Sequence, residues 1–223
     1  MPKRILKNLH QLNNKMTVEK IEKYKGETYM VVIDRVKKVF LHRDIINRFG
    51  LAEGSEITNE QLTQVLMASE LRRASRRAMY LINERDYSYI QLFEKLSANY
   101  SEDICYKVTD MMAKKGFIND RRYAQEVVYT YMECRLYGPR RVKQELYKRG
   151  IRGRIADEVI EENLDGLYER LEKLIDRKYS AYLEDPEDFK AVNRAKNGLV
   201  RAGYDYDDIN YAVKKYIEER EED

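Results

Sequence analysis

Basic side chains are concentrated in one stretch near the middle of the chain. Between Arg135 and Arg154 the sequence has eight Lys or Arg residues and a single acidic residue, Glu145. A local positive charge of this density attracts anionic partners, so the stretch is a candidate surface for binding phosphates or acidic side chains. The alternative is the solvated charged face of an ordinary helix. The candidate binding residues are Arg140, Arg141, Lys143, Lys148, Arg152 and Arg154.

These residues are expected on the outer face of a helix that begins at Pro139 and ends before Gly150. Pro is favoured at the first helical position, where its missing N–H has no helical partner, and Gly is favoured just past the end. At 100° per residue, Val142 and Leu146 lie about 40° apart on this helix. Both should therefore face the core while the basic side chains face solvent.

Two further groups of arginines are candidate binding residues. The first group spans about 140° of a predicted helix. The alternative to a binding role for this group is a solubilising charged face with i, i+4 pairs. The second group follows Asp120, which is expected to cap a helix, and a structural and a binding role are equally open for it. The two groups are Arg72, Arg73, Arg76 and Arg77, and Arg121 and Arg122.

Tyrosines accompany the basic residues, and the chain has 19 of them. Aromatic rings among basic residues can stack on single-stranded bases. Half-buried packing is the commoner use of Tyr at helical spacing. Tyr137 and Tyr147 lie inside the basic stretch and are the candidates for stacking.

Little in the sequence favours catalysis. The only two histidines, His10 and His42, lie near the start. Neither is followed by another His at helical spacing, and the sequence has no Cys-x-x-Cys, so a zinc site is not expected. Asp205 and Asp208 could suggest a magnesium site, but they fit the cap and first turn of a helix, where carboxylates complement the helix dipole. We therefore predict a non-enzymatic protein without catalytic residues, metal or cofactor.

The composition favours long helices. Of 223 residues, 36% are charged and 43% are hydrophobic, with only 3 Pro and 10 Gly, and the net charge is +3. Two cysteines, Cys105 and Cys134, are too few for a disulfide framework. The sequence has no apolar run long enough to span a membrane, and Met1 to Arg4 lack a following signal core. We expect a cytoplasmic protein without membrane association.

The first part of the chain differs from the rest. Apolar and charged residues alternate over 17–22, and apolar β-rich runs cover 29–33 and 36–41 with a turn at Asp34-Arg35, which predicts a small antiparallel sheet. A short helix is expected over 45–49. Capping boxes at Thr58–Gln61 and Ser88–Gln91, and a Pro after Asp185, predict further helix starts.

From residue 58 the pattern repeats about every 50 residues, which is typical of stacked helical units. Long first helices are expected over 58–84, 119–136 and 164–180. The fold class is therefore mainly α, with three tandem three-helix repeats in an elongated curved array, preceded by a small antiparallel β-rich N-terminal segment. The predicted division is 1–57 for the β-rich extension, and 58–118, 119–165 and 166–223 for the repeats.

Three segments in this order resemble the RecX family. They are Arg85–Ser88 with Leu92 and Leu96, Gly116–Ala124, and Gly138–Ile151. The resemblance covers about residues 70 to 165, and the third repeat fits by helix pattern alone. Asn119 stands where an acidic residue is common in the family.

The resemblance implies a regulator of the RecA recombinase that acts in homologous recombination, DNA repair and the SOS response. Family members bind along the groove of the RecA–DNA filament and suppress its ATPase and strand exchange. The expected partners are the RecA recombinase filament and single-stranded DNA, with duplex DNA left open as a further partner, and the expected state is a monomer. The alternative from the residues is a stand-alone nucleic-acid-binding helical-repeat protein.

Overall fold

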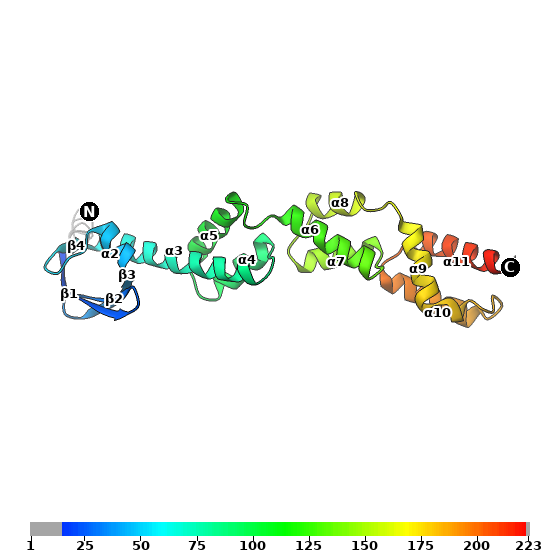
Figure 1. Cartoon of the computed structure of the whole chain (residues 1–223), viewed down its shortest axis with the longest axis horizontal. Coiled ribbons are helices and arrows are strands. Elements are labelled where there is room, and N and C mark those ends of the chain that lie inside the picture. Colours follow the sequence, from blue (N-terminus) through cyan, green and yellow to red (C-terminus); the bar gives the residue numbers. More distant parts are fainter. Residues whose placement is uncertain (1–14, 222–223) are drawn as a thin grey trace, which may run out of the picture. The chain divides into compact units, whose positions relative to one another are not determined.

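The computed structural model describes residues 15–221, and residues 1–14 and 222–223, with His10, lie outside the described part. The chain forms two compact units. Unit 1 combines the chain up to Leu81 with Leu96–Met111, and unit 2 combines Ile82–Lys95 with the chain from Met112 onward. The fold is mainly helical with one antiparallel sheet near the N-terminus, as predicted (Figure 1).

The sheet of unit 1 has the strand order β3-β2-β1-β4, and every pairing is antiparallel. Asp34 and Arg35 have positive φ angles of 49° and 60°, the left-handed conformation that reverses the chain between β2 and β3 as predicted. The fourth strand was not predicted. The strands are β1 (Lys15–Lys25), β2 (Thr28–Ile33), β3 (Lys37–His42) and β4 (Glu56–Thr58).

One face of this sheet packs against two helices, α2 (Arg43–Phe49) and α3 (Asn59–Glu84). The core joins Val31 and Leu41 of the sheet to Val65 of α3. The predicted capping box at the start of α3 is present: the Thr58 N–H donates to Gln61 Oε1 at 2.8 Å, and the Gln61 N–H donates to Thr58 Oγ1 at 3.2 Å. This cap fixes where α3 leaves the sheet.

Helix α5 (Glu102–Lys114) lies mostly in unit 1 and is tied to α3 at its start, where the Ser101 N–H donates to Glu70 Oε1 at 2.9 Å. Helix α4 (Tyr89–Ser97) lies mostly in unit 2. The predicted capping box of α4 is also present, with the Gln91 N–H donating to Ser88 Oγ at 3.2 Å.

Unit 2 contains two further groups of helices, each with its own hydrophobic core. In the first group, the core includes Val128, Val142, Leu146 and Val159. The elements of this group are α6 (Asp120–Tyr129), a π-helical turn η1 (Thr130–Cys134), α7 (Pro139–Lys148) and α8 (Arg154–Glu161). The second group comprises α9 (Leu167–Lys178), a 3-10 turn η2 (Ser180–Tyr182), α10 (Phe189–Ala202) and α11 (Tyr206–Glu221).

The chain backbones of these two groups meet closely. The Gly138 N–H donates to the carbonyl of Ala202 at 2.9 Å, and the Arg140 N–H donates to the carbonyl of Gly203 at 3.1 Å. A Cβ on Gly138 would lie 2.4 Å from the carbonyl carbon of Gly203, so only glycine permits this approach. The contact fixes the start of α7, and with it the basic face of that helix.

One predicted helix start and one predicted capping residue are wrong. Pro186 lies in a turn in which Asp185 Oδ1 accepts from the Glu187 N–H at 3.0 Å, and α10 begins three residues later. Asp188 caps α10 by accepting from the Lys190 N–H at 3.0 Å. Asn119, not Asp120, caps α6.

Candidate functional site

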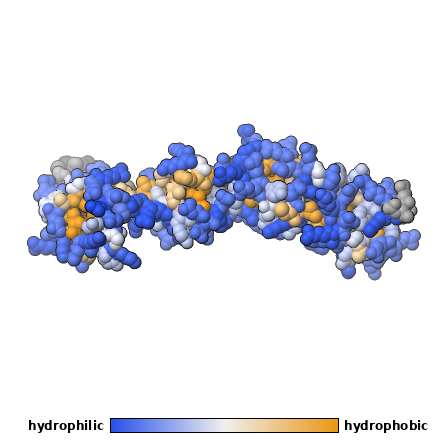
Figure 2. All heavy atoms as spheres, in the orientation of Figure 1, coloured by the Kyte–Doolittle hydropathy of each residue, from blue (hydrophilic) through white to orange (hydrophobic). Residues whose placement is uncertain are grey.

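Helix α7 buries its apolar side chains and exposes its basic ones, as expected. Val142 and Leu146 are fully buried, and the side chains of Arg140, Arg141, Lys143 and Lys148 are at least partly exposed. Figure 2 shows hydrophilic residues over most of the visible face of α6, α7 and α8. The apolar stripe therefore holds the helix in unit 2 while the basic side chains reach solvent.

The single acid of the stretch, Glu145, is buried and organises its neighbours. Its carboxylate lies 2.8 Å from Lys148 Nζ, 2.9 Å from Arg149 Nη1 and 3.6 Å from Arg141 Nη2. Hydrogen bonds from Lys148 and Arg149 lower the pKa of Glu145 to about 2. The i, i+4 spacing of Arg141, Glu145 and Arg149 was visible in the sequence and is the signal for this cluster.

Arg149 has a structural role that the sequence did not reveal. Its Nη2 donates to the Tyr131 hydroxyl at 3.0 Å, and its guanidinium lies 5.2 Å from the Tyr131 ring. Because Arg149 is tied to Glu145 and Tyr131 at once, it joins α7 to the π-helical turn η1 and is not a free cation.

Most of the twelve candidate cations, which do not include Arg149, are also ion-paired. Eight of the twelve arginines and lysines have a carboxylate partner, and most of these pairs are solvent-exposed. Exposed pairs contribute only about 0–1 kcal/mol each, so an incoming anion can replace the carboxylate at little cost. The pairs outside the Glu145 cluster are Arg72–Asp44, Arg121 with Glu158 and Glu162, Arg122–Asp86, Arg140–Asp205, Lys143–Asp157 and Arg154–Glu158.

Four candidate cations have no carboxylate partner within residues 15–221: Arg73, Arg76, Arg77 and Arg152. All four are exposed. Three of them lie on α3, where Arg77 is 5.2 Å from the ring of Tyr80. The uncompensated positive charge of the candidate set is therefore greatest on α3 of unit 1, and not on α7.

The two candidate stacking residues differ in accessibility. Tyr147 is 39% exposed, and Lys143 Nζ lies 5.8 Å from its ring centre. Tyr137 is half-buried and lies between the ring of Tyr131, at 5.8 Å, and the guanidinium of Arg141, at 5.7 Å. Tyr147 has the more open ring face.

Asp120 has a different task from the one predicted. Asn119 Oδ1 accepts from the Arg122 N–H at 3.0 Å and caps α6. Asp120 Oδ1 instead accepts from the Tyr89 N–H at 2.7 Å and joins the start of α4 to α6. Burial raises the pKa of Asp120. The predicted position was wrong by one residue because Asn and Asp cap equally well and only tertiary contact separates them.

The acidic residues near the C-terminus have structural partners. Asp205 pairs with Arg140, and Asp208 Oδ1 accepts from the Tyr168 hydroxyl at 2.9 Å. Within the described residues, no group of three His, Cys, Asp or Glu side chains could hold a metal ion, and no helix is long and apolar enough to cross a membrane. Cys105 is buried and Cys134 is exposed, and both are free thiols.

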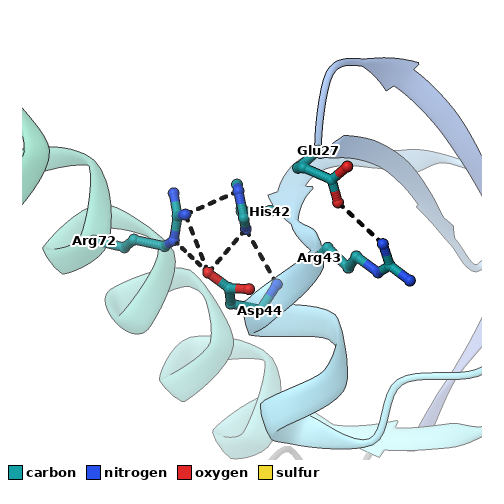
Figure 3. Close-up of polar contacts among 5 residues, drawn as sticks. All are labelled: Glu27, His42, Arg43, Asp44 and Arg72. Carbon is teal, nitrogen blue, oxygen red and sulfur yellow. Dashed lines mark hydrogen bonds and ion pairs between the residues drawn. The ribbon is translucent and has the colours of Figure 1, made fainter.

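In unit 1, Arg72 is held by a small polar network (Figure 3). Arg72 Nη2 lies 2.8 Å from His42 Nε2 and 3.1 Å from Asp44 Oδ2, and the Asp44 N–H donates to His42 Nδ1 at 3.1 Å. His42 thereby caps α2 and at the same time positions Arg72 of α3. Neighbouring Glu27 pairs with Arg43 at 3.3 Å.

Two models of known protein families match the helices of unit 2. The model of the second three-helix domain of RecX matches residues 119–160, and that of the third matches residues 165–213. A protein of Clostridioides difficile named regulatory protein RecX is 28% identical over 90% of this chain and 95% of its own length. The chain belongs to the RecX family.

Other RecX proteins agree over a similar extent. The regulatory protein RecX of Caldanaerobacter subterraneus is 26% identical over 86% of this chain and 95% of its own. A crystal structure titled regulatory protein RecX matches with a TM-score of 0.68 at 20% identity, over 92% of this chain and 99% of the other. The crystal structure of RecX from Lactobacillus salivarius matches with a TM-score of 0.60 at 24% identity, over 66% of this chain and 97% of the other. These two structures support the fold.

Proposed function

We propose that this RecX protein regulates the RecA recombinase by binding along the RecA–DNA filament, and that it lowers filament ATPase and strand exchange without catalysing a reaction. Membership of a family whose relatives are named regulatory proteins supports the regulatory role. The observation that carries the binding step is the set of exposed arginines on α3 without carboxylate partners, because such charges attract phosphates and acidic side chains.

The remaining candidate residues contribute to filament binding by exchanging their present carboxylate partners for anionic groups of the filament. An exposed arginine or lysine that now pairs with Asp205, Asp157 or Glu158 gives up a contact of about 0–1 kcal/mol and gains one to the filament. Many such contacts give affinity through avidity, with no single deep site. Tyr147 adds a ring face on which a base can stack.

We also propose that the chain is a cytoplasmic monomer divided into the β-rich segment 1–57 and three-helix repeats at 58–118, 119–165 and 166–223. The separate cores of the last two helix groups support the later boundaries. Multi-angle light scattering of the purified protein tests the monomer directly, and a dimer would contradict it.

Titration into a RecA ATPase assay on single-stranded DNA tests the regulatory role. The wild-type protein is expected to lower ATP hydrolysis at substoichiometric amounts. A quadruple Ala variant of the unpaired arginines, at Arg73, Arg76, Arg77 and Arg152, should need at least tenfold more protein, about 1.4 kcal/mol of lost binding. No effect of the wild type at equimolar protein would refute the proposal.

A second candidate function is nucleic-acid binding independent of RecA, favoured by the same unpaired arginines. Binding that depends on phosphates weakens steeply as salt rises, with a slope set by the number of neutralised phosphates. Fluorescence anisotropy with single-stranded and duplex DNA, over a range of salt, measures it. If DNA binding is absent at low salt while filament binding persists, this second function is wrong.

A further inference from the structure

Unit 1 contains a pocket of about 360 Å³ between its sheet and α3. Strand β3 contributes Phe40 and His42 to its lining, and α3 contributes Ser69, Arg73 and Arg76. The volume falls near the lower end of the range of about 300–1,000 Å³ that is usual for small-ligand sites. The pocket is therefore large enough for one compact ligand.

The charge of the pocket is positive and largely uncompensated. Arg72, also in the lining, is fixed by His42 and Asp44, as described above. Arg73 and Arg76 are exposed and have no carboxylate partner within the described residues. Among those residues, no Asp or Glu lines the pocket. The two arginines therefore favour an anionic ligand, and their planar guanidinium groups suit the oxygens of a phosphate.

Ser69 adds a polar group that lacks a partner. The residue is only 6% exposed, it lines the pocket, and its hydroxyl makes no hydrogen bond to another residue in the range 15–221. Since no buried side-chain oxygen or nitrogen of the described residues lacks a partner, this hydroxyl is accessible to solvent in the pocket. It can therefore donate to a phosphate oxygen on the same side as the arginines of α3.

Besides Thr28, the lining includes the aromatic rings of Phe40 and Tyr100. Phe40 is 50% exposed, although its ring lies 4.8 Å from that of Tyr24. A half-exposed ring next to arginines suits a ligand with a flat ring beside its phosphate. An acidic peptide would satisfy the arginines but gains little from the ring face of Phe40.

We propose that this pocket binds a nucleotide, with the phosphate on Arg73, Arg76 and Ser69 and the base against Phe40. The ligand is either a free mononucleotide or one residue of a single strand, since both present the same phosphate and base. The inference rests on the proposed function in that it names the ligand of the α3 arginines.

Calorimetric titration of the full chain with thymidine monophosphate, a short oligothymidylate, inorganic phosphate and a glutamate-rich peptide tests the proposal. The oligothymidylate is expected to bind, and R73A and R76A should each weaken it about tenfold, the usual loss for a bond to a charged group. F40L keeps the apolar volume but removes the ring, and should weaken nucleotide binding about fivefold or more without changing phosphate binding. Equal affinity for the mononucleotide would identify free nucleotide as the source.

R48A is the matched control, because Arg48 is an exposed arginine of unit 1 that does not line the pocket and is not a candidate binding residue. It should change oligothymidylate binding less than twofold. Equal losses in R76A and R48A, no effect of F40L on nucleotide binding, or tighter binding of the glutamate-rich peptide would each overturn the proposal. The RecA assay separates the two proposals. If the wild-type protein binds nucleotide without affecting RecA, only the regulatory role is refuted. If it lowers RecA ATPase activity but binds no nucleotide, only nucleotide binding by the pocket is refuted.

Discussion

Replacing Glu145 with Gln is expected to destabilise unit 2 while strengthening the binding of anions by α7. The side chain is buried beside Lys148, Arg149 and Arg141, and its pKa is lowered from 4.5 to about 2, chiefly by hydrogen bonds from Lys148 and Arg149. At 1.36 kcal/mol per pKa unit, this shift sets an upper limit of about 3 kcal/mol on the stability that the ionised carboxylate contributes. The Lys148 side chain is 60% exposed, so solvent screening reduces the expected loss to about 1–2 kcal/mol.

The pH dependence follows from the direction of the shift. A carboxyl group whose pKa is lower in the folded state stabilises the protein fully above its unfolded pKa of about 4.5 and loses this contribution as the pH falls towards 2. The stability difference between wild type and E145Q should therefore be full at pH 7 and less than half as large near pH 3. The lowered pKa of Glu145 thus gives the difference a defined window in pH.

Hydrogen exchange of the α7 amides under increasing urea measures this difference locally, which avoids treating the two units as one transition. E161Q is the control, since Glu161 is exposed on α8 without an ion pair among the described residues, and it should stay within about 0.5 kcal/mol of the wild type. Anion binding should rise in E145Q because Arg141 and Lys148 lose their carboxylate. A variant as stable as the wild type at pH 7, or a difference that does not change down to pH 3, would refute the reasoning.

Three further outcomes are expected. G138A should lower the stability of unit 2 by about 1–3 kcal/mol in urea unfolding, because its Cβ would lie 2.4 Å from the Gly203 carbonyl carbon; an unchanged midpoint would contradict the close approach. Thiol titration of the native protein at pH 8 should modify Cys134 rapidly and Cys105 only after unfolding, since burial both shields Cys105 and raises its pKa; equal rates would be the contrary result. R140E combined with K143E should weaken filament binding at least tenfold in co-sedimentation with RecA, about 1.4 kcal/mol, whereas E161Q should leave it unchanged.

Local patterns in the sequence predicted the helices well. The burial of Val142 and Leu146, the capping box at Thr58 and the stop at Gly150 each depend on residues within about one helical turn of each other, so the signal is contained in a short segment. The same reasoning failed where two local solutions were equally good. Asn119 and Asp120 are both capping residues, and only the bond from the Tyr89 N–H to Asp120 decides between them.

Contacts between distant segments were not predictable in this way. Strand β4 has three residues and exists because Lys15–Thr17 pair with it across some 40 positions of the chain. The pair between Arg140 and Asp205 depends on the approach of Gly138 to Gly203. Net charge along the sequence therefore overestimated the free positive charge of α7, because Asp205 and Asp157 from outside this helix pair with Arg140 and Lys143. It also did not show that the arginines of α3 would be the ones left without carboxylate partners.

This distribution of charge bears on how the protein would select a polymer over single anions. A cation that is already paired with an exposed carboxylate binds a stray phosphate weakly, because the gain is offset by the contact it gives up. The offset is small for each pair, so a partner that presents many anions at once still gains from the sum. Unpaired Arg73, Arg76 and Arg77 have no such offset and can form the first contacts. The paired residues of α6, α7 and α8 then add affinity only for a partner that presents enough anions to contact many of them at once, which disfavours short anionic ligands on that surface.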